Sequence, residues 1–323
     1  RSTLFPYTTL FRSGRRQILA KLDPAYLQVS EMKLSEREFL NALLLRHQPK
    51  TVVEIGVSAG SSSVIILNAL AHIAHSKLYS IDLDKHYYRD SSKKSGFIVD
   101  KYPQLKKNWR FFAGNLAAHY LPKLKDKVDF CFIDTAHCVP GEILDTLMVL
   151  PFMRKGGVVV YHDINIQTMI INGNNYSRQS SYANNVLMST MIGDKFLPSH
   201  FETKNIERMG SYEQKITHNF PNIGAVVLNH NHYQQRAWEL FNALALPWQY
   251  ALSESRVKQL TKFFEGYYRE ELVAMFTQAA GHWNKYLHTH PKEELSHSEV
   301  KFRQLTHQIF CWKRQLTARW RKA

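Results

Sequence analysis

The sequence has 323 residues, of which 44% are hydrophobic, with 42 Lys and Arg, 27 Asp and Glu, and three Cys. This length allows one large domain with additions or two modest ones, and the apolar content excludes intrinsic disorder over most of the chain. The three scattered cysteines form no CxxC pair and exclude a disulfide framework, which favours a reducing compartment. Because no apolar run approaches the ~20 residues that span a bilayer, we expect a soluble, cytoplasmic protein.

The first thirteen residues stand apart from the rest of the chain. The stretch Thr3–Ser13, TLFPYTTLFRS, resembles the conceptual translation of a sequencing-adapter oligonucleotide. We therefore interpret Arg1–Ser13 as an assembly artefact and leave these residues out of the fold analysis.

From residue 15 onward, predicted helices and strands alternate. A helical region over 15–47, with Ser35 as an N-cap, ends before Pro49. Short apolar runs predict strands over Thr51–Ile55, Lys77–Ile81, Arg110–Ala113, Val128–Ile133, Val158–Tyr161 and Ile223–Leu228. Further helices are predicted over Ser61–His75, over Glu142–Met153, and after Gln234 with breaks at Pro247 and around His288–Pro291.

This alternation predicts an α/β fold built on a doubly wound, mostly parallel sheet. We expect a helical N-terminal cap over 14–50, a central domain over 51–232, and a basic, helical C-terminal extension over 233–323. The segment of about 164–214 is rich in Asn, Ser and Met without a strong pattern, so we interpret it as an insertion or lid.

Polar residues or glycine follow five of the predicted strands directly. They are Gly56, Asp82, Asn115, Asp134 and Asp163. In a parallel sheet the carboxyl ends of the strands meet at one edge, and ligands bind there near the point where the strand order reverses. The sequence therefore predicts a ligand site at this edge.

The first strand runs into a glycine turn, Glu54–Gly60, of the form ExGxxxG. Glycines allow close approach of the backbone to a ligand, and the following helix offers free N–H groups. The turn matches neither the dinucleotide fingerprint GxGxxG nor a phosphate-binding P-loop. At the end of the second strand Asp82 is a candidate to accept both hydroxyls of a ribose, with Asp84 as its nearby rival.

Four segments in order, TVVEIGVSAGSSS, LYSIDLD, VDFCFIDTAH and LPFMRKGGVVVYHDI, resemble the class I S-adenosylmethionine-dependent methyltransferases. The resemblance covers Thr51–Ile164, about a third of the chain, and is closest to the branch of small-molecule and sugar O-methyltransferases. It implies a Rossmann-like fold and S-adenosylmethionine as methyl donor. The donor site that it implies consists of Glu54, Gly56, Ser58, Gly60 and Asp82, with Asn115 near the adenine.

The resemblance also implies a divalent metal ion, usually Mg²⁺, held by acids after the fourth and fifth strands. The matching residues are Asp134 and the pair His162-Asp163. Relatives often have two acids, or Asp-Asn, in place of that pair, and Mg²⁺ prefers oxygen ligands. His162 therefore weakens the case for Mg²⁺ or shifts the preference toward a softer ion. Relatives also often carry a second acid two residues beyond the first, where this chain has Ala136.

With that acid missing, His137 becomes the candidate general base, with Asp134 and Asp163 orienting the acceptor. An imidazole with a pKa near neutrality suits removal of a hydroxyl proton. The alternative for His137 is a histidine that only caps or packs against the next loop.

The predicted function is methyl transfer from S-adenosylmethionine to a hydroxyl on a sugar, glycan or other small molecule. Two alternatives stay open: an RNA or DNA methyltransferase, and a non-catalytic binding or assembly module on the same fold. The formal net charge of +15 favours an anionic partner. The chain lacks, however, the N/D-P-P-Y/F motif expected for methylation of an exocyclic amine.

The last segment carries a heptad-like apolar seam flanked by Lys and Arg. Its members are Phe302, Leu305, Ile309, Trp312 and Leu316. The seam suits packing on the chain's own domain or on a second subunit in a homo-oligomer. A basic helix on an anionic membrane and a nucleic-acid contact through Trp312 and Trp320 are the alternatives.

Overall fold

The computed structural model describes residues 26, 29–165, 183–198, 222–229 and 233–290. The predictions for residues 1–25, for the C-terminal seam and for much of the 164–214 insertion lie outside the described residues. Among the described helices, none combines the length and the hydropathy needed to cross a membrane.

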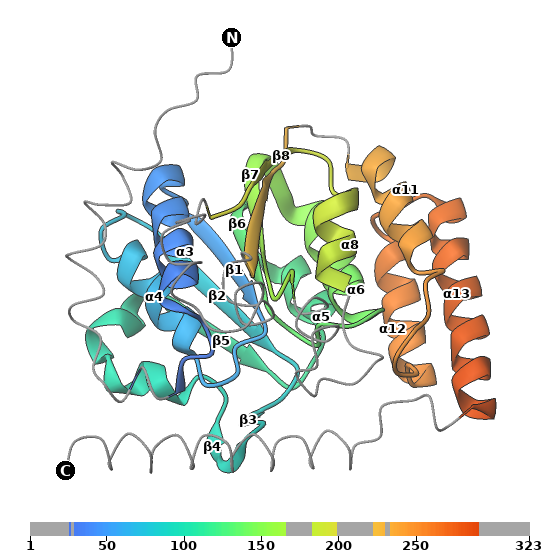
Figure 1. Cartoon of the computed structure of the whole chain (residues 1–323), viewed down its shortest axis with the longest axis horizontal. Helices are drawn as coiled ribbons and strands as arrows, with labels where there is room; N and C mark the ends of the chain where they lie inside the picture. Colours follow the sequence, from blue (N-terminus) through green and yellow to red (C-terminus); the bar gives the residue numbers. More distant parts are fainter. Residues whose placement is uncertain (1–25, 27–28, 166–182, 199–221, 230–232, 291–323) are drawn as a thin grey trace, which may run out of the picture.

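In the described part of the chain, a seven-stranded sheet forms the centre of the molecule, in the order β5-β2-β1-β6-β7-β9-β8 (Figure 1). The strands are β1 (Thr51–Ile55), β2 (Lys77–Asp82), β5 (Trp109–Ala113), β6 (Val128–Ile133), β7 (Met153–His162), β8 (Asp194–Phe196) and β9 (Ile223–Val227). The five strands from β5 to β7 are mutually parallel, whereas β9 runs antiparallel to both of its neighbours. The predicted doubly wound, mostly parallel sheet is confirmed.

The strand order reverses between β1 and β6. Strand β1 pairs with β2 on one side and with β6 on the other, so that Ile55 lies beside both Ile81 and Ile133. From β1 the chain proceeds outward to β5 and then returns to β6. The residues that follow β1, β2 and β6 are therefore gathered at one switch point of the sheet.

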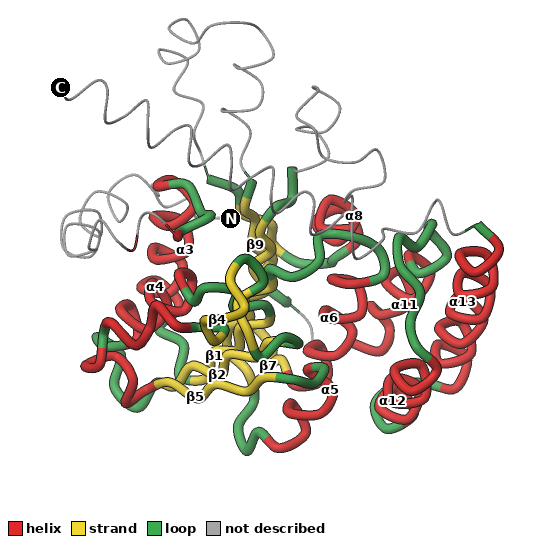
Figure 2. Tube along the Cα trace, turned by 90° about the horizontal axis from the view of Figure 1, so that it is seen from below, coloured by secondary structure: helices red, strands yellow, loops and turns green. Residues whose placement is uncertain are grey.

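Helices cover both faces of the sheet. They are α3 (Leu34–His47), α4 (Ser61–Leu70), α5 (Ala117–Tyr120), α6 (Gly141–Val149), α8 (Ala183–Thr190), α11 (Tyr233–Ala243), α12 (Glu254–Glu265) and α13 (Glu270–Thr289). Helices α3 and α4 pack on one face, and α5, α6 and α8 lie on the other (Figures 1 and 2). Helices α11–α13 pack outside that second group, where α11 contacts α6 and α8 and α12 contacts α5.

Alternating side chains of the central strands fill two cores. In β6, Phe130 and Phe132 face the core under α3 and α4, whereas Cys131 and Ile133 face the core shared with α6 and the C-terminal helices. All four side chains are fully buried. Burial on both faces explains why this strand is an uninterrupted apolar run.

Five of the six predicted strands form with shifts of at most one residue at their ends, whereas β7 starts at Met153, five residues before the predicted Val158. Two helices end earlier than predicted. Helix α4 ends at Leu70, because the Ser76 hydroxyl donates to the carbonyls of Leu70 and Ile73 and closes the last turn. Helix α6 ends at Val149, because Pro151 in the next turn cannot continue the N–H ladder. A short 3₁₀ turn then leads into β7.

The predicted N-cap of the first described helix is wrong. Helix α3 starts at Leu34, so Lys33 is the N-cap and Ser35 lies inside the first turn. The Glu36 side chain, at the third helical position, accepts the backbone N–H of Lys33 at 2.5 Å. A carboxylate reaching back in this way replaces the serine cap.

Two strand pairings have no counterpart in the sequence prediction. A hairpin of β3 (His86–Tyr87) and β4 (Asp90–Lys94) follows β2. Its residues are almost all polar, so it lacks the apolar alternation that marks a strand. In the 164–214 insertion, α8 packs against α6 and β8 pairs with β9. This described part of the insertion thus belongs to the body of the fold rather than to a lid.

We predict that Gly56→Ala destabilises the protein far more than Gly156→Ala, although both glycines have a positive φ, of +87° and +75°. A Cβ at Gly56 would lie 1.9 Å from the carbonyl oxygen of Asp134, whereas a Cβ at Gly156 would meet nothing within 4 Å. Gly156→Ala should therefore lower the free energy of unfolding by about 1–2 kcal/mol, the cost of left-handed backbone. Gly56→Ala should lower it by more than ~3 kcal/mol, because overpacking is added to that cost. Urea denaturation measures both, and equal losses would contradict the close packing at Gly56.

Candidate functional site

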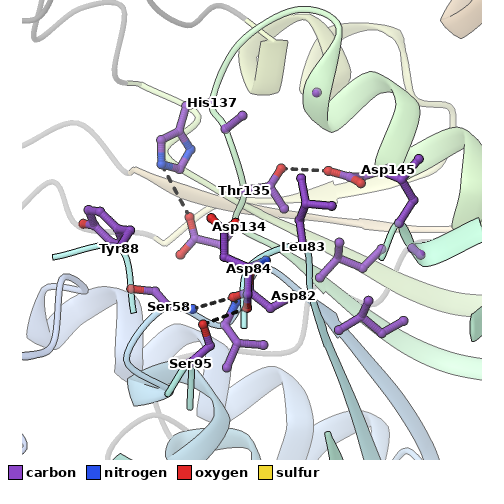
Figure 3. Close-up of a pocket in the computed structure, with 18 of the residues that line it drawn as sticks. Ser58, Asp82, Leu83, Asp84, Tyr88, Ser95, Asp134, Thr135, His137 and Asp145 are labelled. Atoms are coloured by element: carbon purple, nitrogen blue, oxygen red, sulfur yellow. Dashed lines mark hydrogen bonds and ion pairs between the residues drawn. The ribbon is translucent and has the colours of Figure 1, made fainter. Parts of the chain in front are cut away.

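A cavity of about 730 Å³ lies over the carboxyl ends of β1, β2, β5 and β6 (Figure 3). Six of the predicted site residues line it: Gly56, Ser58, Asp82, Asn115, Asp134 and His137. The others, Glu54, Gly60, His162 and Asp163, do not line it. In Figure 3, Ser58 and Asp82 lie on one side of the cavity, and Asp134 and His137 lie on another.

The Asp82 carboxylate is tied to the glycine turn. Its Oδ2 accepts the backbone N–H groups of Val57 and Ser58, both at 3.0 Å, and its Oδ1 accepts that of Asp84 at 2.8 Å. Burial raises the pKa of Asp82, and the three hydrogen bonds oppose that rise. Three of roughly four acceptor positions are thus occupied. One acceptor position is left for a ligand hydroxyl, and the prediction that Asp82 accepts both hydroxyls of a ribose stays a prediction.

Glu54 does not face the cavity, which corrects its predicted place in the donor site. Its carboxylate is fully buried and accepts the hydroxyl groups of Ser62, Ser63 and Ser80 at 2.5–2.6 Å. Burial raises the pKa of Glu54 to about 7, against the opposing effect of the three hydroxyls. The residue joins β1 to the first turn of α4 and to β2, so it positions the glycine turn from behind.

Gly60 is likewise set back from the cavity. It is the N-cap of α4, and a Cβ there would lie 2.8 Å from the Cα of Gly96. At Gly56, too, the close neighbour is the chain's own backbone. The spacing of glycines in this turn is therefore explained by packing within the protein, and Ser61 and Ser62 bring the start of α4 to the cavity.

Residues of the C-terminal segment complete the cavity wall, which the sequence did not indicate. Tyr250, Leu252, Arg256 and Leu260 line it from the loop before α12 and from α12 itself. The predicted extension over 233–323 thus contributes to the site. Because these residues are distant in the sequence from the rest of the cavity wall, no local sequence pattern predicts their contribution.

Asp134, His162 and Asp163 form a compact cluster at the ends of β6 and β7. One ligand atom from each lies within 4.8 Å of the others. The Nδ1 atom of His162 is 3.3 Å from Asp134 Oδ1 and 3.5 Å from Asp163 Oδ2, and its Nε2 atom is 3.3 Å from Glu36 Oε2. Glu36, on α3, was not predicted as a site residue, because its position in the sequence indicates only an acid in the first turn of a helix.

Electrostatics hold this cluster together. Burial alone would lower the pKa of His162, but the carboxylates of Asp134 and Asp163 outweigh it and raise that pKa well above its usual range. Burial alone would raise the pKa of Asp163, but His162 and His137 lower it below its usual range. Asn222 adds a hydrogen bond from its Nδ2 to Asp163 Oδ1. The imidazole and the carboxylates are therefore charged partners.

His137 does not have the pKa near neutrality that its predicted role as a base requires. Its Nε2 is 3.1 Å from Asp163 Oδ2 and 3.8 Å from Asp134 Oδ1, and its Nδ1 is 3.4 Å from Glu142 Oε1. Burial lowers the pKa, but these carboxylates raise it to about 10. In this arrangement His137 keeps its proton at neutral pH and acts as a hydrogen-bond donor. We therefore correct its role from base to cation.

Two acids on α6, one buried and one half-buried, were missed by the sequence analysis. Glu142 is fully buried and accepts the backbone N–H of His137, which holds that loop in place. Asp145 accepts the Thr135 hydroxyl at 2.7 Å and lines the cavity. Burial raises the pKa of Asp145 to about 7.

The donor atoms of the cluster suit a divalent cation. Asp134 and Asp163 offer carboxylate oxygens, and His162 offers Nδ1 once it loses its extra proton. Glu36 then accepts the remaining N–H at Nε2, the carboxylate–histidine arrangement that orients imidazole ligands in metal sites. An imidazole among the ligands favours a transition metal over Mg²⁺.

We predict that Glu54 makes stability fall as pH rises. Because the folded protein binds the Glu54 proton more tightly than the unfolded chain, its contribution is full below pH 4.5 and is lost as pH reaches about 7. The loss is about 3 kcal/mol at ~1.4 kcal/mol per pKa unit. The difference in unfolding free energy between wild type and Glu54→Gln, measured in urea across this pH range, should decline by that amount.

The Ser80→Ala variant serves as the comparison for this test. Removal of the Ser80 hydroxyl takes away a hydrogen bond that lowers the pKa of Glu54, so the decline should extend to higher pH. A flat difference between wild type and Glu54→Gln would contradict the assignment.

Comparisons with known proteins found one matching family model and several similar solved structures. Residues 53–164 match the family model described as a methyltransferase domain. Similar solved structures include the O-methyltransferase TomG of Streptomyces achromogenes, at 15% identity and a TM-score of 0.45, with 68% of this chain and 96% of that chain covered. An O-methyltransferase from Bacillus cereus has 17% identity and a TM-score of 0.43, with 70% and 93% covered. No curated protein is detectably similar in sequence.

The match spans β1 to the end of β7, the segment that carries the glycine turn, Asp82, Asp134 and the His162-Asp163 pair. Residues 53–164 therefore match a methyltransferase domain, and the strands have the doubly wound, Rossmann-like order that the sequence motifs predicted.

Proposed function

We propose that the protein is an S-adenosylmethionine-dependent O-methyltransferase acting on a hydroxyl of a sugar, glycan or other small molecule. The observation that carries the proposal is the cavity itself. It joins the glycine turn and Asp82 to a cluster of carboxylates and imidazoles that begins at Asp134. One part of the cavity suits a nucleoside and the other suits a hydroxyl group that must lose a proton.

The donor's ribose would lie at Asp82, the carboxylate at the end of β2. The free acceptor position of Asp82 takes one ribose hydroxyl, and the start of α4 behind Ser58 offers its N–H groups to the donor's carboxylate. The sulfonium then lies near the end of β6, within the same cavity as Asp134. This orientation places the methyl group beside the acid cluster.

Catalysis would depend mainly on proximity and in-line orientation of the two substrates. The acceptor hydroxyl attacks the methyl carbon, an O–C bond forms as the S–C bond breaks, and S-adenosylhomocysteine leaves. Without a metal ion, Asp134, in the cavity wall, takes the hydroxyl proton. His137, as a cation paired with Asp163, places a positive charge beside the acceptor oxygen.

The proposal includes a divalent metal ion held by Asp134, Asp163 and His162. Such an ion, when bound, lowers the pKa of a coordinated hydroxyl. Glu36 and Asn222 orient two of these ligands, His162 and Asp163.

The acceptor would enter beside Tyr88, a residue that is 41% exposed and lines the cavity. The Tyr88 hydroxyl donates to Glu31 Oε1 at 2.6 Å, which holds the ring in place. An exposed aromatic face suits the apolar face of a sugar or another ring that carries the hydroxyl.

We predict saturable, one-site binding of S-adenosylmethionine to the full chain, measured by isothermal titration calorimetry. Asp82→Ala should weaken binding at least ~10-fold, because it removes a charged hydrogen-bond acceptor and releases the glycine turn. Asp84→Ala is the matched control, since Asp84 is an exposed acid two residues away whose carboxylate accepts no bond from that turn. Absence of binding by folded protein would refute the proposed function. A larger loss of affinity in Asp84→Ala than in Asp82→Ala would assign the ribose to Asp84 instead.

We further predict that the full chain binds Zn²⁺ at least ~100-fold more tightly than Mg²⁺, because imidazole is a good ligand for Zn²⁺ and a poor one for Mg²⁺. His162→Ala should weaken Zn²⁺ binding ~10- to 100-fold, whereas His290→Ala, which removes a histidine at the end of α13, should leave it unchanged. Calorimetric titration of each ion checks both statements. Equal effects of the two variants would refute the metal site at Asp134, His162 and Asp163.

A further inference from the structure

Helix α12 reaches across the cavity wall to the residue that follows β5. The Nε2 group of Gln259, on α12, donates to Asn115 Oδ1 at 2.9 Å, although the two residues are 144 positions apart. The backbone N–H of Leu116 donates to the same oxygen, also at 2.9 Å. Arg256 and Leu260 of the same helix line the cavity beside this contact.

These two bonds decide which way the Asn115 amide points. A backbone N–H can only donate, so the atom that it meets must be the amide oxygen. Oδ1 has two lone pairs, and the N–H groups of Leu116 and Gln259 occupy both. Asn115 can therefore offer the cavity only the N–H groups of its Nδ2. A ligand edge that lies at Asn115 has to be a hydrogen-bond acceptor.

The identity of that edge rests on the proposed function. With the ribose at Asp82 and the sulfonium toward Asp134, the base must extend the other way, along the cavity toward β5. Asp82 pairs with Ala113 of β5, and Asn115 lies two residues beyond Ala113. Leu83, Leu116 and Leu260 give this end of the cavity apolar walls, which suit a flat base.

Adenine and hypoxanthine differ in the hydrogen-bonding character of this edge. The N1 atom of adenine accepts a hydrogen bond, whereas N1 of hypoxanthine carries a hydrogen and donates. An Asn115 amide whose N–H groups face N1 matches adenine, whereas it meets the N1–H of hypoxanthine with an opposed donor. The O6 acceptor of hypoxanthine lies beside N1, so it is reached only if the base shifts. A site whose groups form hydrogen bonds with one base binds an analogue much more weakly when that analogue leaves those groups unpaired.

We propose that Gln259 is a positioning residue that locks the Asn115 amide, so that the donor site selects adenine over hypoxanthine. The C-terminal helix α12 is then part of donor recognition rather than a separate extension. Gln259 acts through Asn115 and need not touch the donor.

The test compares S-adenosylhomocysteine with its deaminated analogue, S-inosylhomocysteine, by calorimetric titration into the full chain. Wild type should bind the adenine compound at least ~10-fold more tightly. Gln259→Glu keeps the side chain's size but places an acceptor against Asn115 Oδ1, so only the Leu116 N–H still holds the amide and this ratio should fall toward one. Gln259→Met removes the donor without adding charge and should also reduce the ratio. Lys258→Ala, at an exposed position of α12, should leave the ratio unchanged.

A purely structural role for Gln259 predicts a different result. Both ligands would then weaken by the same factor in both variants, and an unchanged ratio would overturn the proposal. Binding of both ligands by wild type without preference would overturn it too, while the proposed donor site would stand. Binding of neither ligand by folded wild type would refute the proposed function and this inference together.

Discussion

The contact between Gly56 and Asp134 joins the two halves of the site. The N–H of Gly56 donates to the carbonyl of Ile81 at 2.9 Å, and the N–H of Asp134 donates to that of Ile55 at 3.0 Å. A side chain at Gly56 would collide with the Asp134 carbonyl. The glycine turn after β1 and the acid cluster after β6 are therefore placed by the same backbone contact, at the point where the strand order reverses. Any ligand that spans the cavity lies across this junction.

Four buried or half-buried carboxylates surround that junction, and each has a different partner. Glu54 is compensated by three serine hydroxyls, Asp82 by three backbone N–H groups, and Asp134 and Asp163 by the imidazoles of His137 and His162. Burying a charge without such partners costs several kcal/mol. Hydroxyls and N–H groups give fixed, neutral compensation, which suits positioning. Imidazoles give a positive charge that is lost with a proton and that a metal ion can replace. Such compensation suits a site where protons move.

Much of the fold followed from the sequence, because strand and helix patterns are local. The runs at Thr51–Ile55 and Val128–Ile133 formed strands with the predicted ends, and the residues after the strands came together as predicted. What failed depended on partners distant in the chain. Glu54 was expected to contact the donor, but Ser80 and the start of α4 enclose it. The pKa of His137 depends on Asp163 and Glu142, which no spacing rule associates with it.

The net charge of the chain differs in sign from the balance of acidic and basic residues that line the cavity. The sequence carries a formal net charge of +15, yet the cavity is lined by five acids and only two Lys or Arg. The acids are Glu31, Asp82, Asp84, Asp134 and Asp145, and the two basic residues are Lys85 and Arg256. A polyanion such as RNA gains its binding free energy from Lys and Arg near its phosphates. Carboxylates around the transfer point oppose that approach, whereas they are natural hydrogen-bond acceptors for the hydroxyl groups of a neutral sugar or small molecule. The excess positive charge of the chain is therefore carried elsewhere than on these walls.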